Sequence, residues 1–325
     1  MKDPHRLIFS GGVALFTMAM LSMVQVKVQN PLLLAERLSK NAGWIEILGM
    51  GIYSALVAWN MFNRKNVPRW RILTWNIFSV VFFSQLFLGI LFHEKFLMTG
   101  KLHLPIPAMI LCGPIYRGQL SIMTWLFLGT VVLTGPAWCS HLCYFGAVDA
   151  NMARIKPPRG KIPNKFRIKH TLLLIVIAIT LLFRFLHANA LISTLAGLVF
   201  GIGGLFIIIL WSRKRGKMMH CILYCPVGTL VNYLKIVNPF QMYIDSSCSF
   251  CGSCTQVCRY DALTLKDLSN KKPGITCTFC GDCLSACQIS SLHYKLFGLN
   301  SRISRTLYLF LTISVHTIFL ALARI

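Results

Sequence analysis

The sequence predicts a mainly α-helical protein that crosses a membrane about six or seven times and carries a small, cysteine-rich α+β domain. Composition is the first reason, because 55% of the 325 residues are hydrophobic, 13% are charged and the mean hydropathy is +0.63. A soluble protein is rarely so apolar. Long apolar runs separated by basic loops are the second reason. The third is a doubled cysteine pattern near the C-terminus.

The apolar runs are long enough, or nearly long enough, to span a bilayer as helices. They cover residues 7–26, 44–62, 72–92, 119–138, 172–186, 194–211 and 306–323. We interpret the first as an uncleaved anchor, because residues 20–28 offer no small-residue cleavage site. The last, which contains His316, is expected either to span the membrane or to lie at its surface.

Charge predicts the orientation of these spans. Lys and Arg number 33 against 9 Asp and Glu, giving a formal net charge of +24. The basic residues gather in loops 63–71, 154–169 and 213–217, and such loops normally stay in the cytoplasm. We therefore expect the N-terminus, these loops and the cysteine-rich domain to be cytoplasmic. Nucleic acid is not an expected partner, since no pattern of interleaved aromatic and basic residues is present.

One cysteine pattern, C-x2-C-x2-C-x3-C, occurs twice. It is formed by Cys248, Cys251, Cys254 and Cys258, and again by Cys277, Cys280, Cys283 and Cys287. This is the spacing of bacterial two-cluster ferredoxins, in which the fourth cysteine of each run binds the other cluster. The pattern predicts two [4Fe–4S] clusters. The first cluster set is Cys248, Cys251, Cys254 and Cys287, and the second cluster set is Cys277, Cys280, Cys283 and Cys258.

Zinc and disulfides are the alternatives for these cysteines. Zinc sites usually pair two C-x2-C knuckles and have no use for a third cysteine and a fourth three residues later. A disulfide framework does not need the doubled spacing. The sequence departs from the ferredoxin pattern at Arg259 and Gln288, which stand where proline follows the fourth cysteine. Proline shapes that turn without binding iron.

A second cysteine motif, C-x3-C-x-x-G, also occurs twice, within residues 138–147 and 220–229. Each copy lies at the predicted cytoplasmic end of a span. One copy offers two thiols about a helical turn apart, too few for a four-ligand site. An internal repeat would bring Cys139, Cys143, Cys221 and Cys225 together, and we expect a further iron–sulfur cluster there. Four buried thiols that only fill space are the alternative.

With both motifs considered, the chain resembles the membrane-bound polyferredoxins of the NapH, NosR and CcoG type. It is most similar to the NapH-type quinol dehydrogenase subunits that serve periplasmic nitrate reductase. The resemblance covers essentially the whole chain, and the matching positions are the eight ferredoxin cysteines, Cys139, Cys143, Cys221, Cys225 and Pro226. Tyr144 replaces the proline expected after Cys143.

The resemblance implies a multi-pass protein of the bacterial inner membrane that oxidises menaquinol or ubiquinol. Its electrons would pass through iron–sulfur clusters to a partner iron–sulfur, molybdenum or haem oxidoreductase subunit. The corresponding domains are residues 1–240 in the membrane, 241–297 as the two-cluster ferredoxin-like domain and 298–325 as a membrane or interfacial helix. A quinone-linked copper reductase, as in the CcoG branch, and a redox sensor or assembly factor are the alternative functions.

Quinone chemistry needs an apolar slot with a few groups that move protons. Residues 103–117 are too apolar for a solvated loop and too rich in proline for a spanning helix. We therefore expect the quinone site near His93, Glu94 and His103, although polar residues are also common at a membrane interface. Other candidates are His141 as a proton relay and His187 with His316 as haem ligands. Simple interfacial or core roles are the alternative for each.

Overall fold

The computed structural model describes residues 4–28, 32–97 and 105–322. It divides into two compact units, residues 1–103 with 298–325 and residues 104–297. The predicted domain boundary after residue 240 therefore falls inside the second unit, at the first residue of a strand. His103, one of the predicted quinone residues, lies outside the described residues.

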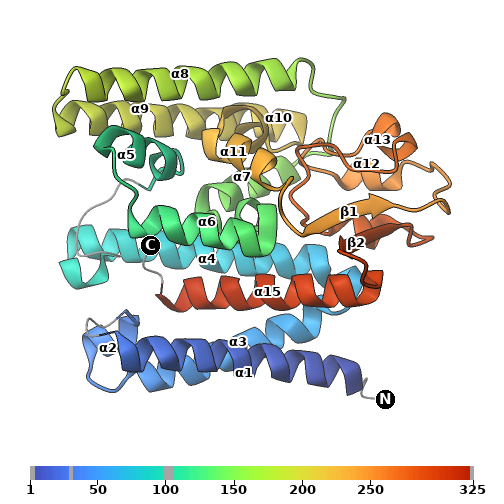
Figure 1. Ribbon diagram of the computed structural model, residues 1–325, viewed down its shortest axis with the longest axis horizontal. Helices are drawn as coiled ribbons and strands as arrows, with labels where there is room; N and C mark the ends of the chain where they lie inside the picture. The colour runs from blue at the N-terminus through green and yellow to red at the C-terminus, as the bar shows by residue number, and fades with distance from the viewer. Residues whose placement is uncertain (1–3, 29–31, 98–104, 323–325) are drawn as a thin grey trace. The chain divides into compact units, whose positions relative to one another are not determined.

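The first unit consists of helices (Figure 1). These are α1 (Pro4–Lys27), α2 (Leu34–Leu38), α3 (Gly43–Met61), α4 (Val67–Leu91) and α15 (Ser301–Leu322), with short 3-10 turns η1 (Arg64–Asn66) and η2 (Glu94–Phe96). Helices α1, α3 and α15 pack together around a core that includes Val13, Val57 and Ile313. Arg305 from α15 donates hydrogen bonds of 3.0 Å to the carbonyls of Met61 and Phe62. These bonds satisfy carbonyls that the end of α3 would otherwise leave unpaired.

The part of the second unit that precedes the cysteine-rich segment, residues 109–234, is also helical. It contains α5 (Met109–Arg117), α6 (Ile122–Thr134), η3 (Gly135–Ala137), η4 (Trp138–Leu142), α7 (Tyr144–Arg154), α8 (Lys165–Phe185), α9 (Ala190–Ile207), η5 (Ile208–Ser212), α10 (Arg213–Arg215), η6 (His220–Tyr224) and α11 (Pro226–Leu234). The segments η4, η5 and η6 are π-helical turns. Such turns are frequent at functional sites, and two of them hold the C-x3-C motifs.

The cysteine-rich segment of the second unit contains a two-stranded antiparallel sheet. Strand β1 (Phe240–Ile244) pairs with β2 (Leu292–Leu296) in a register that places Phe240 opposite Leu296. Buried and half-buried residues alternate along β1, as expected for a sheet with one face on a core. Three short helices lie between the strands, α12 (Ser253–Val257), α13 (Leu265–Ser269) and α14 (Asp282–Ala286).

The mainly helical prediction is confirmed. Among the described residues, five helical segments are long and apolar enough to cross a membrane: 4–27, 64–91, 165–185, 190–215 and 301–322. A sixth span is available if Thr124–Leu142 and Tyr144–Arg154, bent by 54° at Cys143, form one broken span. Helix α3 covers the predicted run 44–62 but is not among these segments.

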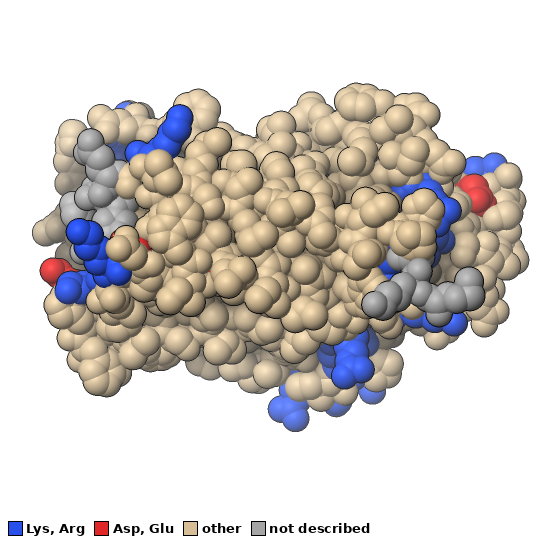
Figure 2. Space-filling model, turned by 90° about the horizontal axis from the view of Figure 1, so that it is seen from below, with Lys and Arg blue, Asp and Glu red and all other residues tan. Residues whose placement is uncertain are grey.

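The surface distribution of charge fits a membrane environment. On the face shown in Figure 2, charged side chains lie at the left and right and along part of the lower edge, and a broad area between them shows none. Many large apolar side chains of α1 and α3 are exposed, including Ile8, Leu15, Ile45 and Leu48. Exposed apolar side chains on this scale are costly in water but not in lipid.

Candidate metal centres

The two C-x3-C motifs have the same local structure. In each motif a π-helical turn carries the first cysteine and ends at the second, Cys143 or Cys225. The backbone torsions are φ −76° and ψ 112° at Cys143, and φ −76° and ψ 115° at Cys225. Each of these cysteines then caps the helix that follows, α7 or α11, with its sulfur. The two copies of the motif therefore share a backbone conformation as well as a sequence pattern.

Backbone N–H groups are directed at the capping sulfurs. Gly146 N donates to Cys143 Sγ, and Gly228 N donates to Cys225 Sγ, each at 3.4 Å. A Cβ on Gly228 would lie 3.0 Å from the carbonyl oxygen of Cys221, so glycine lets the first turn of α11 pack closely on the turn that carries Cys221. N–H groups placed in this way stabilise thiolate charge, which iron ligation requires.

The four C-x3-C cysteines line one cavity. Its lining combines both motifs with more distant segments: Pro107, Trp138, Cys139, Cys143, His220, Cys221, Ile222, Cys225, Val227, Gly228, Asn232, Tyr260, Thr276 and Thr278. Burial raises the pKa of Cys225 to about 11. Burial, followed by Asp149 and the three other thiols of the group, raises the pKa of Cys221 well above its ordinary value. Buried thiols that repel one another's ionisation suit a positively charged metal centre.

Three glycines of α9 make room for neighbouring segments, and two of them face the second motif. A Cβ on Gly201 would lie 2.6 Å from Ile106, and one on Gly203 would lie 2.9 Å from the hydroxyl of Tyr224. A Cβ on Gly204 would lie 3.0 Å from the ring of His220. The flat surface of α9 therefore allows η6 and the segment before α5 to pack closely on this helix.

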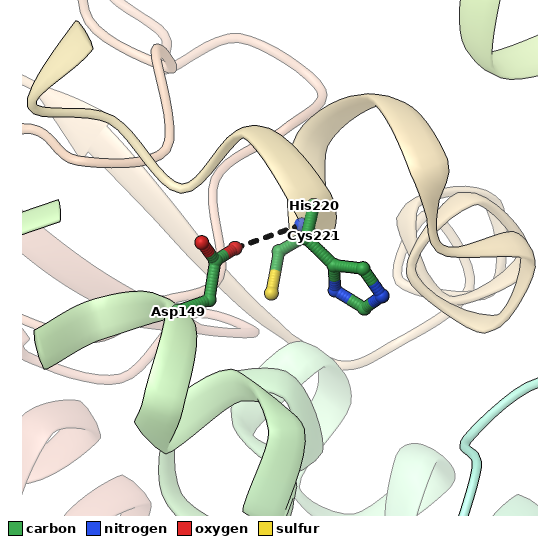
Figure 3. A group of neighbouring side chains, drawn as sticks. All are labelled: Asp149, His220 and Cys221. Carbon is green, nitrogen blue, oxygen red and sulfur yellow. Dashed lines mark hydrogen bonds between the residues drawn. The ribbon is translucent and has the colours of Figure 1, made fainter. Parts of the chain in front are cut away.

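Asp149 and His220 place polar groups beside Cys221 (Figure 3). Asp149, on α7, accepts a 3.0 Å hydrogen bond from the backbone N–H of Cys221. Its other oxygen and the Nδ1 atom of His220 are buried and have no hydrogen-bond partner among the described residues. Ligand atoms of Asp149, His220 and Cys221 all lie within 4.8 Å of one another. In the described part of the chain, this group alone is close enough to bind a single ion, and it contains one cysteine.

The two ferredoxin loops also share one backbone conformation. Phe250 and Phe279 both have a φ of 55°, and Gly252 and Gly281 have φ values of 76° and 79°. After the fourth cysteines, Ala262 N donates to Cys258 Sγ and Ser291 N donates to Cys287 Sγ, each at 3.3 Å. Glycine adopts such positive φ values without steric cost.

The thiols group by cluster set rather than by sequence run. Cys287 lines a pocket together with Cys248, Cys251 and Cys254. Around Cys283, burial and then the thiols of Cys280, Cys277 and Cys258 raise the pKa well above its ordinary value. Each fourth cysteine is thus beside the other run's first three. Four thiols per set, with Cys251 exposed and the other seven partly or fully buried, fit [4Fe–4S] clusters.

Direct contacts connect the ferredoxin loops to the C-x3-C cavity. The hydroxyl of Tyr260 donates to the carbonyl of Cys139 at 3.0 Å. The hydroxyl of Ser140 donates to the carbonyl of Thr278 at 3.2 Å and lies 3.0 Å from Nδ1 of His141. His141 is therefore buried in this contact.

The predicted quinone residues that are described lie at the end of α4. His93 and Glu94 are exposed, and Nδ1 of His93 accepts a hydrogen bond of 3.0 Å from Lys95 N. Pro107, which lines the C-x3-C cavity, belongs to the second unit. The following helix α5 packs on α8, where Arg184 donates to the carbonyl of Ile115 at 3.1 Å. No quinone pocket is built from His93 and Glu94 by these contacts.

The two histidines considered for haem lie in different units. His316, in the first unit, is buried, and its Nε2 is 3.0 Å from the hydroxyl of Tyr53. His187, in the second unit, is exposed and has a φ of 47° at the end of α8. The contact of His316 with Tyr53 fits a core histidine.

Comparison with known proteins gives one family match. Residues 119–168 match the family described as a 4Fe-4S binding domain. That stretch contains Cys139 and Cys143 and none of the eight ferredoxin cysteines. No curated protein and no solved structure matches the chain. The match fits an iron–sulfur protein of the ferredoxin type, and it falls on the first C-x3-C motif.

Several residues of the cavity carry no signal in the sequence. His220, Tyr260 and Thr278 line the cavity and Asp149 contacts Cys221, but none of the four is a cysteine or glycine of the repeated motifs. His220 was detectable only as the neighbour of Cys221, and Tyr260 only by its position in the turn where proline was expected.

Proposed function

We propose that the chain is a quinol-oxidising electron-transfer subunit of the NapH type in the bacterial inner membrane. The observation that supports this most is the cavity lined by Cys139, Cys143, Cys221 and Cys225, which lies beside the eight-cysteine segment and next to helices suited to a membrane. An iron–sulfur cluster held there would supply one-electron chemistry close to the membrane. The partner would be an iron–sulfur, molybdenum or haem oxidoreductase subunit.

Side chains of this protein must accept the protons that a quinol releases on oxidation. Oxidation of a quinol releases protons as well as electrons, so an imidazole or carboxylate must lie near the ring. His93 and Glu94 remain our candidates, since both are exposed and can pass protons to water.

Contacts between the basic loops support a cytoplasmic position for the ferredoxin segment. Arg159 N donates to the carbonyl of Arg215 at 2.9 Å, so loops 154–169 and 213–217 meet. Lys217 also donates to the carbonyl of Gly160. Two basic loops in contact belong on one side of a membrane, and basic loops normally stay in the cytoplasm.

The experiment measures iron, sulfide and quinol-dependent reduction on full-length protein in detergent. Iron and sulfide should exceed the content of two [4Fe–4S] clusters, and a menaquinol or ubiquinol analogue should bleach the visible absorption. The excess iron and the bleaching should both disappear in the Cys139→Ser, Cys221→Ser double variant. Iron matching two clusters, with all four C-x3-C thiols open to alkylation, would refute the third centre.

Quinone-linked copper reduction is the second candidate, and the group of Asp149, His220 and Cys221 favours it. Thiolate and imidazole are ligands that copper prefers, and the three ligand atoms are close enough for one ion. Copper(II) should then reoxidise protein that quinol has reduced, and His220→Asn should slow this step without lowering iron content. Reoxidation that does not depend on copper would exclude this candidate.

A further inference from the structure

The two turns that follow the fourth ferredoxin cysteines are alike in backbone and opposite in environment. Asp261 and Ser290 occupy equivalent positions with φ values of 52° and 56°. After Cys287, residues Gln288, Ile289 and Ser290 are all exposed. After Cys258, Tyr260 is 4% exposed and Asp261 is 2% exposed. One turn is therefore docked on the rest of the second unit and the other is free of it.

Arg259 ties the docked turn to both halves of the internal repeat. It donates to the carbonyls of Ala153 at 3.1 Å and Lys156 at 2.7 Å, at the end of α7. It also donates to the carbonyl of Gly216 at 2.7 Å, just before η6. The arginine therefore satisfies carbonyls of the helix that follows Cys143 and of the loop that precedes Cys221. Proline could not make these contacts.

Asp261 forms the charged part of the same contact. Its Oδ2 atom is 2.9 Å from Nζ of Lys165, at the start of α8, and its Oδ1 atom accepts from Lys217. The backbone N–H of Ile162 donates to Oδ2 at 3.3 Å. The buried carboxylate thus has three hydrogen-bonding partners. A buried ion pair is stable only when its charged groups have such additional hydrogen bonds.

Tyr260 lies between these two anchors and reaches the cavity itself. Its ring lines the cavity and its hydroxyl donates to the carbonyl of Cys139. Lys235, which follows α11, donates to the carbonyl of Cys277 at 2.9 Å. The second cluster set is therefore linked to the first repeat through Tyr260 and to the second repeat through Lys235. The pocket of the first cluster set, by contrast, is lined only by residues 244–292.

We propose that Arg259, Tyr260 and Asp261 fix the second cluster set beside the C-x3-C centre, with Tyr260 as the positioning residue at the contact. The first cluster set, whose Cys251 is exposed, is then the distant one. The proposal rests on the third centre assigned under the proposed function. The second cluster set is the neighbour of that centre, and these three residues hold it there.

The test measures magnetic coupling between reduced centres, so it needs no quinol and no turnover. Full-length protein is reduced with titanium(III) citrate, and pulsed electron paramagnetic resonance records the relaxation and dipolar splitting of the C-x3-C centre. Cys280→Ala removes a ligand of the second set, and Cys254→Ala removes a ligand of the first. We expect the strongest coupling to disappear in Cys280→Ala and to persist in Cys254→Ala. Loss in Cys254→Ala instead, or equal loss in both, would overturn the assignment.

A matched pair of tyrosine variants tests the positioning role. Tyr260→Phe and Tyr294→Phe each lose one hydroxyl that donates to a backbone carbonyl, Cys139 in one case and Phe279 at 2.7 Å in the other. Iron content should stay the same in both. The coupling of the C-x3-C centre should weaken or spread over a wider range of distances in Tyr260→Phe alone. Unchanged coupling in Tyr260→Phe would refute its role.

Asp261→Asn provides a second variant of nearly the same shape. It removes the charge that pairs with Lys165 and Lys217, and we expect the same spread of coupling as in Tyr260→Phe. A normal coupling in this variant would show that the charged anchor does not hold the contact. If the wild type shows no third signal, the proposed third centre fails and this inference fails with it. The two kinds of failure are therefore distinguishable.

Discussion

Gly204 of α9 lies directly against the His220 ring of η6, and a Cβ at Gly204 would be 3.0 Å from Cδ2 and Nε2 of that ring. Since His220 precedes the cavity cysteine Cys221, a side chain at Gly204 must displace the second C-x3-C turn. Overpacking of this kind costs about 1–3 kcal/mol. We expect Gly204→Leu to reduce iron at the C-x3-C centre and to leave the two ferredoxin clusters in place. Iron analysis and electron paramagnetic resonance measure both.

The control for this variant is Gly129→Leu in α6. A Cβ at Gly129 would have no neighbour within 4 Å, so the same substitution adds the same bulk without the contact. It should retain the full iron content. Equal iron loss in both variants would show that the effect is a general loss of helix packing.

The exchange of fourth ligands predicts which cluster each cysteine variant damages. Cys258 is one of the thiols that raise the pKa of Cys283, whereas Cys287 lines the pocket of Cys248, Cys251 and Cys254. Cys258→Ser should therefore remove or convert the cluster of the second set, and Cys287→Ser that of the first. Electron paramagnetic resonance of the two variants distinguishes the clusters. Damage to the Cys248 cluster by Cys258→Ser would contradict the exchange.

Asp261 predicts a pH dependence of stability. Burial alone would raise its pKa, but hydrogen bonds and charges from Lys217 and Lys165 outweigh burial, and its pKa lies below the ordinary value of 3.8. A carboxyl with a lowered pKa in the folded state stabilises the fold above its unfolded pKa, and the contribution is lost as the pH falls through the folded value. The unfolding midpoint of wild-type protein should therefore exceed that of Asp261→Asn near neutral pH.

The difference between the two proteins should shrink from about pH 5 downward, as the carboxylate begins to bind protons. Tryptophan fluorescence during heating, on full-length protein in detergent, measures both midpoints in the same buffers. Acid damage to the clusters affects both proteins alike. A constant difference across this range would mean that the charge of Asp261 does not contribute.

Asn238 connects the segment before β1 to the end of α6. Its Nδ2 donates to the carbonyls of Val131 at 3.0 Å and Val132 at 2.7 Å, and it is 4% exposed. Removing the buried amide takes one donor from each of these carbonyls, so Asn238→Ala should destabilise the protein by about 1–3 kcal/mol. Asn60→Ala is the control, because the Asn60 amide is exposed and bonds to Leu56 in its own helix. Thermal unfolding in detergent should show little change for the control.

The orientation predicts where a label at Arg159 is reached. Arg159 is exposed in loop 154–169, so Arg159→Cys can be probed with a thiol reagent that does not cross membranes. We expect labelling in inverted membrane vesicles and none in intact spheroplasts, because basic loops remain cytoplasmic. A matched position on the other side is Phe185→Cys, which is exposed at the opposite end of α8. Labelling of Arg159→Cys from outside the spheroplasts would reverse the topology.

The sequence by itself determined the features that depend on local spacing. Hydropathy over single segments predicted a helical membrane protein, because a spanning helix must be apolar along its own length. Cysteine spacing predicted the iron–sulfur ligands, because three thiols within one loop meet a cluster only at that spacing. The C-x3-C repeat was also readable, since each copy of the turn is stabilised by bonds within its own few residues, such as Gly146 N to Cys143 Sγ.

Only the tertiary structure decided what surrounds those ligands. Asp149 reaches Cys221 from another helix, and Tyr260 reaches Cys139 from the ferredoxin segment, so neither contact leaves a periodic signal in the sequence. The two ferredoxin turns have matching spacing, and their letters alone did not show that Asp261 would be buried against Lys165 while Ser290 stayed exposed. That difference arises because a buried charge is stable only where distant segments supply its partners.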